Sequence, residues 1–115
     1  MAGIDYITIA GRTFRVEVNW NATTAFLQAV GRDSIDELSK IQSFRPSELT
    51  ALMAACIAEG ERLDGNTDTP TALDLGAIIR PDDVAKFLEI YIRQSSPQMD
   101  VDPPKKEDRA KSPDP

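Results

Sequence analysis

The chain has 115 residues, of which 19 are acidic and 13 basic, so its net charge is −6. A chain of this length usually forms one domain. Its acidic surplus argues against nucleic-acid binding, which depends on clustered Lys and Arg. Histidine is absent, so the commonest general acid–base group and the commonest metal ligand are both missing. No catalytic constellation stands elsewhere, so these features predict a non-enzymatic protein without a cofactor or metal.

Cysteine usage and hydropathy bear on where the protein works. The single cysteine, Cys56, lies in an alanine-rich apolar stretch and is expected to be a small core residue. One cysteine cannot form an intramolecular disulfide, and no apolar run reaches the roughly 18–20 residues that span a bilayer. The first residues also lack the basic and hydrophobic regions of a signal peptide. The sequence therefore predicts a cytoplasmic protein that does not enter a membrane.

Residues 4–18 predict a β-hairpin. Apolar residues alternate with polar ones on both sides of Gly11, whose freedom to adopt positive φ suits a tight turn. A turn about Gly11 pairs odd with even positions and leaves Arg15 and Glu17 on the outside. It places these apolar residues on one face: Ile7, Ile9, Phe14, Val16 and Val18. Such a hairpin needs helices against that face, because two strands alone are only marginally stable.

Two helices are predicted next. Asn21 is expected to cap the first, which ends at Gly31. The second, a short helix ending near Gln42, begins with a capping box formed by Ser34 and Glu37.

Three further helical segments follow Pro46, which suits the first turn of a helix. That helix runs to Leu63 with apolar residues at helical spacing, and residues 73–79 predict a short helical turn. Pro81 opens the last helix, whose first turn carries two aspartates at the positive end of the helix dipole. The predicted fold is thus α+β: an N-terminal β-hairpin packed on about four helices.

Domain organisation follows from a change in composition at Ser96. Residues 1–95 predict one compact α+β domain. Residues 96–115 are rich in proline and charge and poor in apolar side chains, so they cannot bury enough surface to offset the entropy lost on ordering. They predict a disordered tail.

The candidate functional residues are apolar side chains that could bind a partner protein: Trp20, Phe44, Ile90, Tyr91 and Ile92. Trp20 follows the hairpin and is either a lid on the core or an exposed anchor. Ile90 and Ile92 widen the apolar face of the last helix, which serves either its own domain or self-association and partner binding. Phe44 either plugs the core or protrudes.

The order of these elements resembles the tail assembly chaperones of long-tailed bacteriophages and the related gene-transfer-agent proteins. The resemblance covers roughly residues 5–95 and departs from the family at the polar insert 64–71 and in the length of the tail. It rests on four segments: the hairpin 7–18, the short helix 34–38, the Ala/Leu-rich helix 46–57 and the acidic start of the last helix, 81–84.

The resemblance implies a function. Proteins of this family bind the long tape-measure protein, keep it soluble and help recruit tail-tube subunits. They work in the host-cell cytoplasm and are expected to be absent from the mature virion. Two other classes stay open: a structural virion component such as a head–tail connector or minor tail protein, and a small acidic adaptor or antitoxin-like protein.

Overall fold

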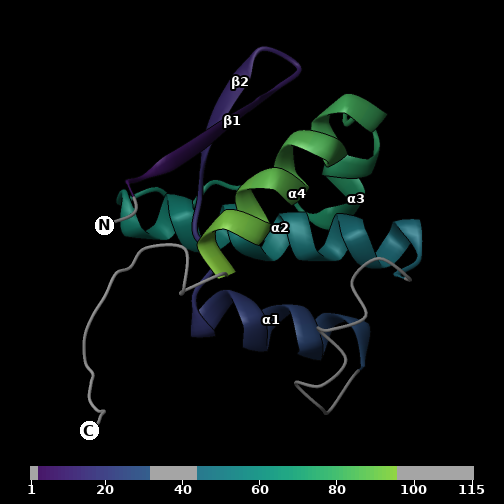
Figure 1. Ribbon diagram of the computed structural model, residues 1–115, viewed down its shortest axis with the longest axis horizontal. Coiled ribbons are helices and arrows are strands. Elements are labelled where there is room, and N and C mark those ends of the chain that lie inside the picture. The colour runs from purple at the N-terminus through teal and green to yellow at the C-terminus, as the bar shows by residue number, and fades with distance from the viewer. Residues whose placement is uncertain (1–2, 32–43, 96–115) are drawn as a thin grey trace, which may run out of the picture.

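The computed structural model describes residues 3–31 and 44–95, which form an α+β fold with a hairpin packed on four helices (Figure 1). The predicted helix over residues 34–42 and the predicted tail over residues 96–115 lie outside the described residues. The elements in chain order are β1 (Asp5–Ile9), β2 (Arg12–Val16), α1 (Trp20–Val30), α2 (Pro46–Leu63), α3 (Ala72–Gly76) and α4 (Pro81–Ser95).

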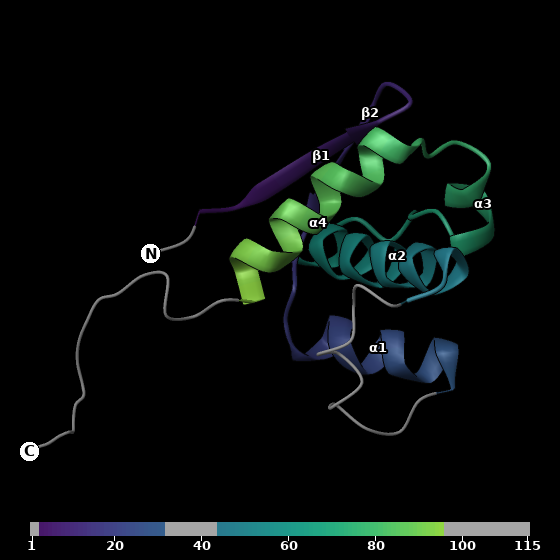
Figure 2. The ribbon, with the colours of Figure 1, turned by 45° about the vertical axis from the view of Figure 1, so that its right-hand side comes forward.

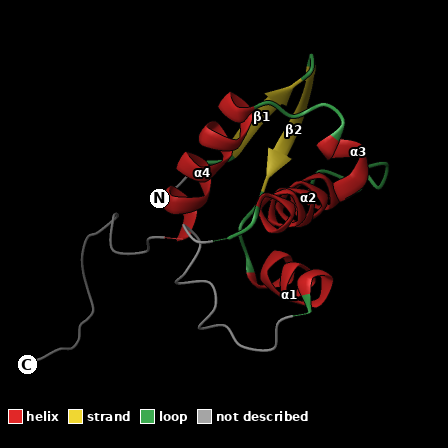
Figure 3. Cartoon of the chain, turned by 90° about the vertical axis from the view of Figure 1, so that its right-hand side faces the viewer, coloured by secondary structure: helices red, strands yellow, loops and turns green. Residues whose placement is uncertain are grey.

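Helix α2 lies at the centre of the described structure. The hairpin and α4 lie on one side of it and α1 on the other, as two views of the ribbon show (Figure 2). Viewed nearly along α2, the helix α3 lies beside it and β2 runs down onto it (Figure 3). The core fills the space between these elements, and its largest fully buried side chains are Phe14, Phe26, Phe87, Ile9, Leu52, Met53, Ile57 and Leu75.

The hairpin has the predicted register. Ile7 pairs with Phe14, and Ile9 pairs with Arg12 across a two-residue turn. Both turn residues have positive φ, 52° at Ala10 and 81° at Gly11, as expected for the primed turns that match strand twist. The apolar side chains of both strands therefore share one buried face, and the predicted pairing is confirmed.

Arg15 lies on the outer face of the hairpin, as predicted, but its side chain is only 15% exposed. Nη1 of Arg15 contacts Oδ1 of Asp64 at 2.6 Å, and Nη2 contacts Oε1 of Glu17 at 3.2 Å. Burial of a cation requires such partners.

Helix α1 begins two residues earlier than predicted. Its N-cap is Asn19, whose side chain accepts a hydrogen bond from the backbone N–H of Ala22 at 3.0 Å. Asn21 lies in the first turn and donates to Glu59 instead. Gly31 ends the helix in the left-handed conformation, with φ of 71°, which confirms the predicted C-terminus.

Helix α2 starts at Pro46, as predicted, and closes the outer edge of β2. Gly60 faces β2 so closely that a Cβ atom there would lie 2.2 Å from the carbonyl oxygen of Arg15. The carboxylate of Glu61 accepts the Arg15 backbone N–H at 2.8 Å, and the Cys56 carbonyl accepts that of Glu17 at 3.1 Å. Thus α2 accepts the outward-facing N–H of Arg15 in β2 and that of Glu17 just after the strand.

Helix α4 is hydrogen-bonded to the N-terminal part of the chain through Gln94, near its own C-terminal end. Gln94 donates to Asp5 and to the carbonyl of Val16, and its side-chain oxygen accepts from the backbone N–H of Val18. At the other end of α4, Asp83 accepts a hydrogen bond from the backbone N–H of Arg80 at 2.8 Å. This contact agrees with a capping role for the acidic first turn.

Candidate partner-binding site

The five residues predicted to bind a partner do not form one surface. Trp20 and Ile92 are exposed, 65% and 55% respectively. The other three, Phe44, Ile90 and Tyr91, belong to the buried core. The Phe44 ring packs on that of Phe26, with 5.5 Å between centroids. In the described structure these three side chains pack within the domain, which was the other alternative for Phe44 and for the last helix.

The wide apolar face of α4 is used within the domain. Ile90 borders β1 beside Ile7, whereas Tyr91 packs against Phe87 and lies near Cys56 of α2. Consecutive residues on a helix point about 100° apart, so α4 needs apolar side chains in two directions to fill the space between β1 and α2. Of the predicted pair on this helix, Ile92 alone remains exposed.

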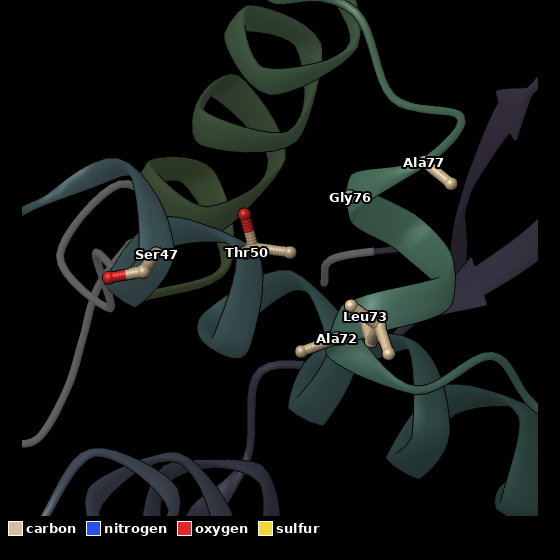
Figure 4. A pocket seen from close by; sticks show the side chains of 6 residues that line it. All are labelled: Ser47, Thr50, Ala72, Leu73, Gly76 and Ala77. Carbon is tan, nitrogen blue, oxygen red and sulfur yellow. The ribbon is translucent and has the colours of Figure 1, made fainter.

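An apolar groove lies instead between the N-terminal half of α2 and α3. Its volume is about 580 Å³. We call it the client groove and define it by its lining residues, Ser47, Thr50, Ala72, Leu73, Gly76 and Ala77. Figure 4 shows Ser47 and Thr50 on α2 at one side of the groove and Ala72 and Leu73 on α3 at the other. Leu73 is 86% exposed, the largest exposed fraction among the large apolar side chains of the described residues.

Local sequence explains how α3 presents Leu73. The Thr71 hydroxyl accepts from the Asp74 backbone N–H at 3.1 Å, and the Asp74 carboxylate accepts from that of Thr71 at 3.2 Å. This capping box starts a single helical turn. Leu75 is fully buried and anchors that turn to the core. Because Leu73 is two positions away, it points to a different side of the helix.

The apolar surface continues beyond the client groove. A second hollow of about 330 Å³ shares Ala72 with it and runs between α1, α2 and the segment 69–72. Its lining consists mainly of alanines: Ala25 and Ala29 of α1, and Ala51, Ala54, Ala55 and Ala58 of α2. Small side chains leave room for the larger apolar side chains of a partner.

The client groove could not be predicted from the sequence because neither of its two sides carries a motif. Ser47 and Thr50 are ordinary residues of the first two turns of a helix, and residues 73–79 form one short apolar segment in the sequence. One signal was present. Two leucines two positions apart on a one-turn helix cannot both face the core, so one of Leu73 and Leu75 had to be exposed.

The most perturbed ionisable groups have structural roles. Burial raises the pKa of the Cys56 thiol to about 12, so the thiolate that would act as a nucleophile does not form near neutral pH. Hydrogen bonds from Arg62, at 2.8 and 2.9 Å, lower the pKa of Glu59 to about 2, although burial of this carboxylate acts in the opposite direction. Asn19 and Asn21 also donate to it, so Glu59 ties α1 to α2.

The described residues offer neither a metal-binding cluster nor a membrane-spanning helix. Residues 3–31 and 44–95 contain no group of three Cys, Asp or Glu side chains placed to hold a metal ion. Within the same ranges, no helix has both the length and the apolar character needed to cross a membrane.

Comparison of the sequence with protein-family models found no match, and comparisons with curated proteins and with solved structures found none either.

Proposed function

We propose that this protein is a non-enzymatic tail assembly chaperone that holds apolar helical segments of a tape-measure protein in the client groove. The observation that carries the proposal is the open apolar surface between α2 and α3, with Leu73 86% exposed at its side. As such a chaperone, the protein acts in the host-cell cytoplasm, helps recruit tail-tube subunits and is absent from the finished virion.

The shape of the groove suits a helix. Amphipathic helices bind by laying an apolar face into a hydrophobic groove, with anchors spaced at three and four residues. The client groove offers small side chains at its base, Ala72, Gly76 and Ala77, and one large apolar side chain, Leu73. It continues into the alanine-lined hollow through Ala72, so a helix of several turns would find apolar surface along its length.

Charge supports the same role. The chain carries a net charge of −6, and charge far from zero keeps proteins from associating nonspecifically. A carrier that covers the apolar face of a client while adding negative charge would keep the complex in solution.

The test is co-expression with the long coding sequence expected downstream of this gene, measuring the soluble fraction of that client. The decisive variant is Leu73→Asp, which places a charge beside the groove without touching the core. Its matched control is Ile92→Asp, another exposed apolar residue on a different helix. We expect the client to be soluble and to co-purify with the wild type and with Ile92→Asp, and to precipitate with Leu73→Asp.

Three results would contradict the proposal. If the client is equally soluble alone and forms no complex, the chaperone role is wrong. If Ile92→Asp abolishes the complex and Leu73→Asp does not, the client binds α4 and not the groove. If the protein is found in purified particles in a fixed ratio to tail subunits, it is a structural component.

A further inference from the structure

The two edges of the hairpin differ in how their main-chain groups are bonded. Since Ile9 and Arg12 flank a two-residue turn, these residues and Ile7 with Phe14 form the hydrogen-bonded pairs of the ladder. The N–H and C=O groups of the alternate residues then point away from the partner strand. On β2 the N–H of Arg15 is bonded by Glu61 of α2, and the N–H of Glu17, just beyond the strand, is bonded by the Cys56 carbonyl.

On β1 the corresponding groups belong to Tyr6 and Thr8. Among the residues that the structure describes, no hydrogen bond reaches the main chain of either residue from outside the ladder. Residues 5–9 contain no proline or lysine, and the register of the strand has no bulge. Tyr6 and the preceding Ile4 are also exposed, 53% and 57% respectively.

A groove of about 430 Å³ runs along this open edge, with α4 as its other wall. Its lining includes Tyr6 and Thr8 from β1 and Lys86, Glu89, Ile90 and Arg93 from α4. Arg93 is paired with Asp5 at 2.5 Å. Lys86 has no ion pair within the described ranges, so its charge is available to a bound partner, with Glu89 one turn away.

The geometry points to a second binding site, in which an extended segment of a partner protein adds to β1 as a third strand and places a carboxylate beside Lys86. Main-chain hydrogen bonds to Tyr6 and Thr8 provide the affinity, as in other cases of strand addition. Alternate side chains of the partner contact Tyr6 on the outer face and α4 on the inner face.

A single strand fits this edge better than a second copy of the domain. The α4 residues that line the groove, from Lys86 to Arg93, span about two helical turns alongside β1. A two-fold arrangement of two β1 edges would bring two α4 helices against each other, and packed helices need 8–10 Å between their axes. A single extended chain brings no second helix against α4.

The test uses the full chain, labelled with ¹⁵N, and the acetylated, amidated hexapeptide TVEVTV. The third residue is Glu, and two further peptides carry Thr or Lys in its place. We expect amide shifts centred on Tyr6, Thr8 and Lys86, with tightest binding for the Glu peptide. Methylating two alternate peptide nitrogens removes main-chain donors and should weaken binding about tenfold or more, since each hydrogen bond contributes roughly a factor of five.

A charge variant tests whether Lys86 favours a peptide carboxylate, independently of the main-chain pairing. Lys86→Glu should lower the affinity for the Glu peptide by about fivefold and leave the affinity for the Thr peptide unchanged, as expected for an exposed charge pair. Arg80→Glu is the matched control, because Arg80 is exposed and precedes α4 outside this groove. It should change neither affinity.

Several outcomes would overturn the inference. One is the absence of shifts at Tyr6 and Thr8 with all three peptides at millimolar concentration, and another is insensitivity to N-methylation. Shifts centred on Leu73 and Gly76 would assign the peptide to the client groove instead. Doubling of the mass with protein concentration, together with protection of the Tyr6 and Thr8 amides in the free protein, would assign the edge to a second copy. None of these results depends on the solubility of the tape-measure client, so the two sites are tested separately.

Discussion

At its C-terminal end α2 presses its backbone against β2, whereas at its N-terminal end it faces α3 across an open groove. The contact with β2 depends on Gly60, where there is no room for a side chain. The groove is lined by Ser47 and Thr50 on the same helix, and the Gly76 position opposite them has open space around it. Small residues thus allow close packing at the C-terminal end of α2 and leave open space at its N-terminal end.

The two ends of α2 thus have different roles: the C-terminal end contributes to the stability of the fold, and the N-terminal end contributes to the proposed binding. The C-terminal end bonds the main chain of β2 through Cys56 and Glu61, and joins α1 through Glu59. Close packing of this kind leaves no surface for a partner. Beside the N-terminal end, Leu75 is the buried anchor of α3, and apolar surface remains exposed at Leu73. Changes at the first end should alter folding, and changes at the second should alter binding.

The largest effect is expected from Gly60→Ala. The new methyl group would lie 2.2 Å from the Arg15 carbonyl oxygen and 2.6 Å from its carbon, and both are backbone atoms that cannot move aside without shifting β2. We expect the free energy of unfolding to fall by about 3 kcal/mol or more, the upper range for overpacked sites. Urea denaturation followed by circular dichroism measures this change.

Gly76→Ala is the control for that substitution. Apart from its chain neighbours and the backbone of its own helix, no atom of the described residues lies within 4 Å of a Cβ placed at Gly76, so the same chemical change should not destabilise the protein there. Equal losses at both glycines would mean that the contact between Gly60 and β2 is not what makes Gly60 sensitive.

A smaller effect is expected at Glu59, which connects α1 to the closed end of α2. Glu59→Gln keeps the shape but removes a charge that accepts from Arg62 and Asn19, so stability at pH 7 should fall by about 2 kcal/mol, as for hydrogen bonds to charged groups. The Glu59 pKa is lowered from an ordinary 4.5 to about 2 in the folded state. Its contribution is therefore complete above pH 4.5 and lost as the pH falls towards 2.

Denaturation curves of the wild type and of Glu59→Gln between pH 7 and pH 2 test this dependence. The two proteins should differ most near neutrality and converge at the acidic end of the range. A constant difference across that range would show that the charge of Glu59 does not contribute to stability.

Local signals in the sequence were enough to predict most elements of the fold. Gly31 and Pro46 mark helix ends through backbone preferences that depend on no distant residue, and the hairpin register follows from alternation about Gly11. Where two local signals competed, the choice was wrong: Asn19 and Asn21 can both cap a helix, and it is the Asn19 side chain that accepts the Ala22 backbone N–H.

Features that depend on distant contacts could not be predicted. Gly60 has no local signature, because its role comes from a strand more than forty residues earlier. Ile90 and Tyr91 were assigned to a binding face because the sequence does not reveal that α4 contacts both β1 and the region of Cys56. The client groove was missed for the same reason: α2 and α3 must first be placed side by side.

The smallest expected effect on stability, and the sharpest test of the open end, comes from Gly76→Leu. The position has ordinary helical backbone and free space around it, so the substitution should raise the free energy of unfolding by about 0.5–1 kcal/mol through loss of glycine flexibility. The leucine side chain would occupy the client groove that Gly76 lines. A protein that is more stable yet no longer keeps its client soluble would show that the open space itself serves binding. If client solubility is unchanged, the groove is not where the client binds, whatever the effect of Leu73→Asp.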